Sequence, residues 1–155
     1  MTSFAIIEAK QHHCGFMARH LRLEHRAVVM GLGVHCHREL RARFDLSDWR
    51  RSWIVDGRVA GLGGVCGALL SPTGYVWLAL TNEALAHPLA IVKETRRQLA
   101  DIMLTKRELL TAILHEDAKS MRFAEFLGFE PVKIHDEDGV TLMRYPAEAR
   151  PGRLM

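Results

Sequence analysis

The segment that most restricts how this chain can fold is residues 109–129. Residues 109–114 are an apolar run, which predicts a buried strand, and a polar break follows at residues 115–117. A short helix then ends at Gly128, because glycine most easily adopts the left-handed conformation that closes a helix. The apolar residues that we expect near one face of this helix are Met121, Ala124 and Phe126. A strand, a capped helix and a chain that returns to the core at Phe129 therefore form one compact unit.

Length and composition favour one soluble globular domain. The chain has 155 residues, of which 48% are hydrophobic and 25% are charged. We expect the domain to occupy residues 1–145 and a loose tail to follow at residues 146–155. No apolar stretch is long enough to span a bilayer, and the first residues show no secretory pattern. Three scattered cysteines fit a reduced cytosolic setting, and a net charge of +3 is too small to indicate nucleic-acid binding.

Periodicity and turn residues predict an α/β chain with the order β-α-α-β-β-β-α-β-α-β-β. Asp56-Gly57 indicates a hairpin turn, and Pro88 suits the first turn of the longest helix. The predicted helices are residues 11–23, 35–44, 88–104 and the helix that Gly128 closes. The predicted strands are residues 4–9, 52–55, 58–70, 75–81, 109–114, 131–134 and 140–145.

The helix after residue 117 resembles the C-terminal signature of the GCN5-related N-acetyltransferase (GNAT) superfamily, which is Asn-x-x-Ala-x-x-Phe-Tyr-Glu-x-x-Gly-Phe. The corresponding residues here are Asp117, Ser120, Phe123, Ala124, Glu125, Gly128 and Phe129. The resemblance implies a single-domain GNAT-like mixed sheet with helices on both faces, and the predicted element order agrees with it. It also implies that the usual proton donor is missing, because Ala124 replaces the Tyr that protonates the leaving thiolate of coenzyme A in many members.

The same resemblance implies where acetyl-CoA or another acyl-CoA would bind. Members of the superfamily hold it where two parallel strands splay apart, and the backbone of the first of these strands pairs with the pantetheine arm. The residues expected in that strand are Leu78, Ala79, Leu80 and Thr81. The helix residues expected to contribute are Asp117, Ser120 and Phe123.

The pyrophosphate of the cofactor would rest on amides at the N-terminus of the next helix, where the helix dipole favours anions. The family marks this turn with Gln/Arg-x-x-Gly-x-Gly/Ala, and only Ala90 matches it here. Pro88 stands at the first Gly and removes one amide donor. The amides left for a phosphate are those of Leu89, Ala90 and Ile91. Binding of an acyl-CoA and its absence therefore both stay open.

Several turns and aromatic stretches over residues 4–145 look like a GNAT-like family of phage and prophage proteins, some of them internal virion proteins of T7-like phages. They are Glu24 before a Gly-rich break, Trp53-x-x-Asp-Gly57, the strand from Gly61 to Gly67, Tyr75-Val-Trp77, and His87-Pro-Leu-Ala90. This resemblance implies a phage or prophage origin, with the protein in the bacterial cytoplasm or in the virion. It leaves activity open.

Two functions from different classes follow from these resemblances. The first is acyl transfer from acyl-CoA to an unknown amine, with backbone N–H groups near Leu80 polarising the thioester carbonyl. The base that takes the amine proton, through water, would be Glu24 or His115. The second is a catalytically inactive GNAT-like protein that acts as a virion component or interacts with phage structural proteins. Ala124 and Pro88 both favour the second.

Two histidine-cysteine clusters, His12-His13-Cys14 and His35-Cys36-His37, lack the spacing of a zinc site, so we expect no metal and place these histidines at the surface. The glycines of residues 61–67 indicate a strand with a close neighbour, because no helix follows as a phosphate-binding loop requires. We expect the thiol of Cys66 in the core.

Three tryptophans and an arginine-rich face complete the candidates. Trp49 and Trp53 are expected to bury against the sheet, whereas Trp77 is the best candidate for a pocket wall. We expect the following arginines to form a solvated surface that neighbouring acidic residues balance: Arg38, Arg41, Arg43, Arg50 and Arg51. Neither a membrane nor nucleic acid is expected as a partner.

Overall fold

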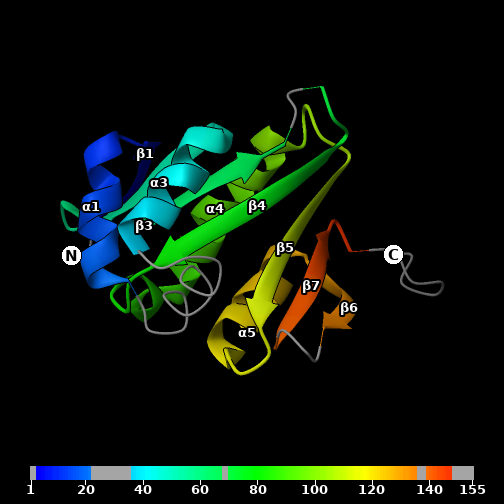
Figure 1. Cartoon of the computed structure of the whole chain (residues 1–155). Coiled ribbons are helices and arrows are strands. Elements are labelled where there is room, and N and C mark those ends of the chain that lie inside the picture. Colours follow the sequence, from blue (N-terminus) through cyan, green and yellow to red (C-terminus); the bar gives the residue numbers. More distant parts are fainter. Residues whose placement is uncertain (1–2, 22–35, 68–69, 136–138, 148–155) are drawn as a thin grey trace.

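A computed structural model of the chain describes residues 3–21, 36–67, 70–135 and 139–147. One mixed seven-stranded sheet has helices on both faces, in the order β1-β2-β3-β4-β5-β7-β6 (Figure 1). Its strands are β1 (Phe4–Glu8), β2 (Ser47–Val55), β3 (Arg58–Cys66), β4 (Thr73–Leu80), β5 (Glu108–Leu114), β6 (Glu130–His135) and β7 (Val140–Tyr145). The helices are α1 (Gln11–His20), α3 (Cys36–Leu46), α4 (Pro88–Ile102) and α5 (Ala118–Leu127), with a 3-10 turn η1 at Ala84–Ala86. The predicted fold class and element order are confirmed.

The first half of the sheet is an antiparallel meander built on tight turns. Asp56 and Gly57 have φ angles of 48° and 78°, as the hairpin signal predicted, and they join β2 to β3. Strand β2 begins at Ser47 and is longer than the predicted residues 52–55, because its polar first half pairs with β3. Sequence patterning missed that half, since Arg50 and Arg51 are only half-buried there.

The two faces of the sheet pack against different helices. Alternate residues of β4 separate between them: Trp77 and Ala79 join the core under α1 and α3. Val76, Leu78 and Leu80 join the larger core that contains residues of α4 and α5. Because successive side chains of a strand point to opposite faces, β4 links both cores at the centre of the sheet.

The glycines of β3 allow close approach of bulky neighbours, as expected. A Cβ at Gly64 would lie 2.7 Å from the Oγ of Ser47 and 2.8 Å from the Nε1 of Trp77. A Cβ at Gly61 would lie 2.8 Å from a methyl of Leu80. The large side chains of β2 and β4 therefore meet across β3 only because it lacks side chains at these positions.

Helix α5 is capped at both ends. Oδ1 of Asp117 accepts a hydrogen bond from the backbone N–H of Ser120 at 3.2 Å, and Gly128 closes the helix with a φ of 111°. The face predicted for this helix was partly wrong: Phe126 is 60% exposed. The buried residues of α5 are Ser120, Phe123, Ala124 and Leu127. The helix is thus rotated about its axis relative to the expectation, with Phe123 in place of Phe126 toward the sheet.

Several expectations fall partly or wholly outside the described residues. Helix α1 ends at His20, and the following residues 22–35, including Glu24, are not described. Of the predicted tail, the backbone N–H of Ala147 donates to the carbonyl of Gly128 at 2.9 Å, and residues 148–155 are not described. None of the described helices is both long and apolar enough to cross a bilayer.

Candidate functional site

Strands β4 and β5 begin side by side and then separate. They are parallel and pair only at Thr73 with Glu108, Gly74 with Leu109, and Tyr75 with Leu110. Beyond these pairs the two strands diverge (Figure 1), while β5 continues to pair with β7 along its other edge. From Val76 onward the edge of β4 that faces β5 therefore has no strand ladder. We call the space between the two diverging strands the wedge.

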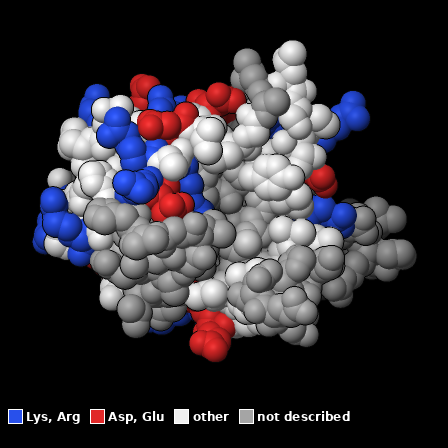
Figure 2. All heavy atoms as spheres, in the orientation of Figure 1, with Lys and Arg blue, Asp and Glu red and all other residues white. Residues whose placement is uncertain are grey.

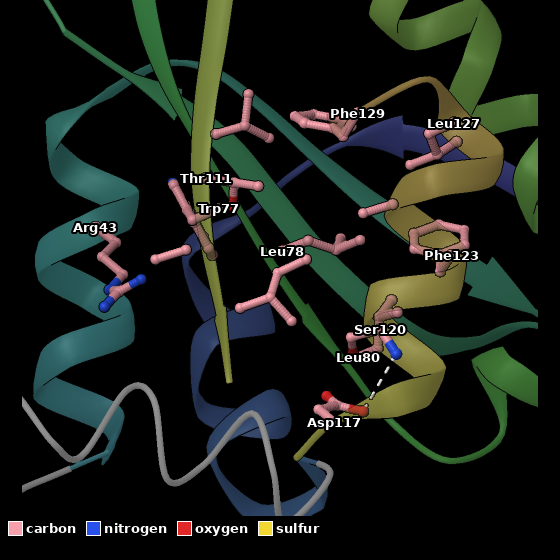
Figure 3. A pocket seen from close by; sticks show the side chains of 14 residues that line it. Arg43, Trp77, Leu78, Leu80, Thr111, Asp117, Ser120, Phe123, Leu127 and Phe129 are labelled. Atoms are coloured by element: carbon pink, nitrogen blue, oxygen red, sulfur yellow. Dashed lines mark hydrogen bonds between the residues drawn. The ribbon is translucent and has the colours of Figure 1, made fainter. Parts of the chain in front are cut away.

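A cavity of about 150 Å³ lies in this wedge. Figure 3 shows side chains of β4 and β5 between helix α3 on one side and helix α5 on the other. Most of the lining is apolar, and the charged residues in it are Arg43 and Asp117. The lining residues that the argument uses are Arg43, Trp77, Leu80, Asp117, Ser120 and Ala124. In the space-filling view, a hollow of uncharged atoms lies beside the charged half of this face (Figure 2).

The structure brings most of the predicted cofactor residues of β4 and α5 to this cavity. Leu78, Leu80, Asp117, Ser120 and Phe123 all line it. Two other predicted residues, Ala79 and Thr81, do not line the cavity, because each makes its contacts elsewhere in the protein. Ala79 is buried on the opposite face of the sheet, and the Thr81 hydroxyl and N–H both donate to the carbonyl of Ala60, at 3.2 and 2.9 Å.

The N-terminus of α4 offers fewer amides than the sequence suggested. The N–H of Ile91 already donates to the carbonyl of His87 at 3.2 Å, and the Ile91 side chain is fully buried. Because Pro88 has no N–H, the amides of Leu89 and Ala90 are the ones that the first helical turn leaves for an anion. The side chain of Leu89 is 87% exposed.

The cations of α4 are partly engaged. Arg96 donates two hydrogen bonds to the carbonyl of Phe126, one of them from Nε at 3.0 Å, which ties α4 to the end of α5. Arg97 pairs with Glu94 at 2.8 Å, and Lys93 is exposed near the start of the helix. Lys93 is thus the nearest candidate in sequence for a phosphate at this end.

Of the two candidate bases, only His115 lies within the described residues. It follows β5 directly, and its side chain is exposed and does not line the cavity. Its Nδ1 lies 2.8 Å from the Oγ1 of Thr141, a buried residue of β7. His115 therefore sits at the end of the strand that forms one side of the wedge, as predicted, and would reach the cavity only through water.

Arg43 and Ser47 are site residues that sequence reasoning missed, since we placed Arg43 on a solvated surface. Arg43 is half-buried at the cavity. The Oγ of Ser47 accepts a hydrogen bond from the Nε1 of Trp77 at 2.7 Å and donates one to the carbonyl of Arg43 at 2.7 Å. The Sγ of Cys66 lies 3.2 Å from the same oxygen, and Cys66 is half-buried. Trp77 is a wall of the cavity, as expected, and Ser47 fixes its indole.

The surface placement of one predicted histidine was wrong. His13 is buried, and its Nδ1 accepts a hydrogen bond from the N–H of Lys10 at 3.1 Å and lies 2.7 Å from the Oγ of Ser52. Burial lowers the pKa of His13 below 6.5, and the positive charges of His12 and Lys10 act in the same direction. Burial also raises the pKa of the Cys14 thiol. Within the described ranges, no group of three or more His, Cys, Asp or Glu side chains could hold a metal ion.

Comparison with solved structures identifies the architecture as the GNAT acetyltransferase fold. An aminoglycoside acetyltransferase bound to coenzyme A superposes with a TM-score of 0.64 at 13% identity, over 92% of this chain and 94% of that one. The ribosomal-protein-S18-alanine N-acetyltransferase from Escherichia coli gives a TM-score of 0.65 at 11% identity over 99% of both chains.

A GNAT-family acetyltransferase from Streptococcus pneumoniae gives a TM-score of 0.54 at 12% identity, over 92% of this chain and 98% of that one. No protein-family model and no curated protein matches the sequence itself. The structural similarity therefore confirms the fold, and the chemistry must be argued from the wedge.

Proposed function

We propose that this protein is an acyl-CoA-dependent N-acyltransferase. The observation that carries the proposal is the wedge, where β4 and β5 stop pairing after Tyr75 and Leu110 and enclose a cavity. Solved proteins of the same fold have coenzyme A or acetyl-CoA bound. A cavity at the divergence of two parallel strands is also where open α/β sheets place ligands.

The residues around the wedge fit the thioester end of such a molecule. Backbone groups of β4 beyond Val76 lack a β5 ladder, so this edge suits the amides of a pantetheine arm. The Ser120 hydroxyl and the apolar side chains of Leu78 and Phe123 line the same space. The amides of Leu89 and Ala90, with Lys93, would hold the phosphates.

When bound, acyl-CoA supplies an activated acyl carbon, so that a C–N bond to an amine forms as the C–S bond breaks. Backbone N–H groups near Leu80 would stabilise negative charge on the carbonyl oxygen. His115, or Glu24, would accept the amine proton through water. Ala124 lines the cavity but offers no proton; Ser120, one turn earlier on α5, also lines it and carries a hydroxyl that would have to supply the proton for the departing sulfur.

Calorimetry with coenzyme A and acetyl-CoA tests the proposal. The expected result is saturable binding with one molecule per chain. Ala112→Trp should abolish it, because Ala112 lines the cavity and a large ring there fills the space. Ala100→Trp, at an exposed position of α4, is the matched control and should bind as the native protein does. No detectable heat of binding at millimolar ligand, or equal binding by both variants, would contradict the proposal.

The rival is a GNAT-like protein without catalysis that serves as an interaction module. Ala124 and Pro88 favour it, because they stand where a proton donor and an amide donor are expected. A phage or prophage origin, and a place in the virion, stay predictions, since none of the compared structures reported above concerns a phage protein. Detection of this chain in purified particles would support the rival.

A further inference from the structure

The lining of the cavity includes a positive charge, that of Arg43, for which the described part of the fold shows no structural role. Arg43 lines it from helix α3, whereas the cofactor residues of α5 line it from the other side (Figure 3). Among the described residues of the lining, Arg43 and Asp117 are the only ones with charged side chains. Asp117 caps α5 by accepting from Ser120, so its carboxylate has a structural role.

The guanidinium of Arg43 has no such role in the part of the chain that the structure describes. No hydrogen bond or ion pair of its side chain is present there, although Arg41 and Arg50 of the same face are both engaged. Arg41 pairs with Asp45 at 3.4 Å, and Arg50 stacks over the ring of Phe44 with 4.2 Å to its centroid. A half-buried guanidinium beside an apolar cavity is costly without a partner.

The backbone beneath Arg43 is held in place. The hydroxyl of Ser47 donates to the Arg43 carbonyl at 2.7 Å and accepts from the indole of Trp77 at 2.7 Å. The backbone that carries Arg43 and the aromatic wall of the cavity are thus both held by the side chain of Ser47. The guanidinium of Arg43, which lines the cavity, is a planar fork of N–H donors that matches the geometry of a carboxylate.

We propose that Arg43 binds a carboxylate on the acceptor, so that the acceptor is a small amine carrying a carboxylate, such as an amino acid. This assignment rests on the proposed function. Arg43 lies on the side of the wedge opposite α5, so an amine that enters on the side away from the proposed cofactor residues would meet it. The cavity of about 150 Å³ restricts the part of the acceptor inside it to a small group.

The test is a panel of α-amino acids and the corresponding amino acid amides, each supplied with acetyl-CoA while release of the CoA thiol is measured. Both sets carry the amine, and only the acids carry the carboxylate. We expect at least one acid to be acylated and its amide to react at least about tenfold more slowly, as expected for loss of a charge-assisted hydrogen-bonded pair.

Arg43→Gln should lower kcat/KM for the acid at least about tenfold, mainly through KM, so that the preference for the acid over its amide is lost. Arg43→Lys should restore part of the difference. Arg38→Gln, at an exposed position of the same helix, is the control and should match the native protein. An unaltered preference in Arg43→Gln would overturn the assignment.

Two further outcomes distinguish a failure of this inference about Arg43 from a failure of the proposed acyltransferase function. In the first, coenzyme A binds while carboxylated amines are not acylated, or are acylated no faster than their amides. Either result would contradict the proposed role of Arg43 without contradicting the proposed acyltransferase function. Loss of preference for succinyl-CoA over acetyl-CoA in Arg43→Gln, with neutral amines, would place the carboxylate on the acyl group and also overturn the assignment. Failure of coenzyme A to bind would contradict both the role of Arg43 and the proposed acyltransferase function.

Discussion

At the scale of single residues, the packing of Trp77, a wall of the cavity, depends on a glycine. Gly64 leaves room for the hydrogen bond between Trp77 and Ser47, because its missing Cβ would lie 2.7 Å from the Ser47 oxygen and 2.9 Å from the carbonyl of Trp49. We expect Gly64→Ala to lower the free energy of unfolding by roughly 1–3 kcal/mol, the usual cost of overpacking. Urea denaturation measures the change.

The control for that variant is a glycine with open space. Gly15 lies in α1, and the nearest atoms to its missing Cβ, in the ring of His37, are 3.9 Å away. Gly15→Ala should raise the free energy of unfolding by about 0.5–1 kcal/mol, because alanine favours a helix more than glycine does. Equal losses from both substitutions would show that the space at Gly64 has no special role.

The pKa of His13 predicts how stability responds to acid. Its pKa is lowered in the folded state, so between that value and 6.5 the unfolded chain binds more protons than the folded one. Stability from this group is therefore complete above pH 6.5 and declines as the pH falls below it. His13→Asn, which keeps an acceptor and does not titrate, should flatten the dependence of the urea midpoint on pH between 7.5 and about 5. His20→Asn, at an exposed position, should leave it as steep as in the native chain.

Which single residues the sequence could place depended on whether a local pattern fixed them. Asp117, Ser120 and Phe123 were predicted at the site because residues 117–129 resemble the GNAT signature, which is a local pattern, and all three line the cavity. Arg43 was missed because it reaches the cavity only through the packing of α3 on the sheet, which no local pattern contains. Phe126 was misplaced because a single apolar residue does not define the phase of a short helix.

At the scale of the elements, α5 depends on its N-cap. Asp117 satisfies the N–H of Ser120, and no other side-chain cap of this end is present among the described residues. Asp117→Ala should destabilise the protein by about 0.5–2 kcal/mol, whereas Asp117→Asn should cost much less because it keeps the capping oxygen. Thermal unfolding of the two variants makes the comparison, and an equal loss would argue against capping as the cause.

The same helix suggests a gain of function. If protonation of the leaving sulfur limits turnover, Ala124→Tyr should raise kcat by about tenfold or more, within the range of general acid catalysis. Ala118→Tyr, at an exposed position of the same helix, is the control. An unchanged kcat and pH profile in a variant that still binds coenzyme A would show that α5 supplies no proton.

At the scale of the whole molecule, the topology was predictable and the depth of the site was not. Turn residues such as Asp56-Gly57 and the break after β5 are local, so the order of the elements followed from the sequence. The wedge is different, because the point where β4 and β5 separate depends on how far Tyr75 and Leu110 can stay paired in a twisted sheet. That point decides which side chains face the cavity.

Binding should also be visible in global stability. A ligand that binds only the folded chain, at a hundred times its dissociation constant, stabilises it by about 2.7 kcal/mol. Coenzyme A at that excess should therefore raise the melting temperature of the native protein and of Ala100→Trp, and leave that of Ala112→Trp unchanged. The same shift in all three proteins would mean that coenzyme A binds outside the wedge.

The central claim is that the gap between β4 and β5 holds the thioester arm of an acyl-CoA. A crystal structure of the protein grown with coenzyme A tests it most directly. The account predicts density for the pantetheine arm along the edge of β4 beyond Val76, with its sulfur near Ser120 and Ala124. A cavity filled by the protein's own side chains, or coenzyme A bound elsewhere, would contradict it.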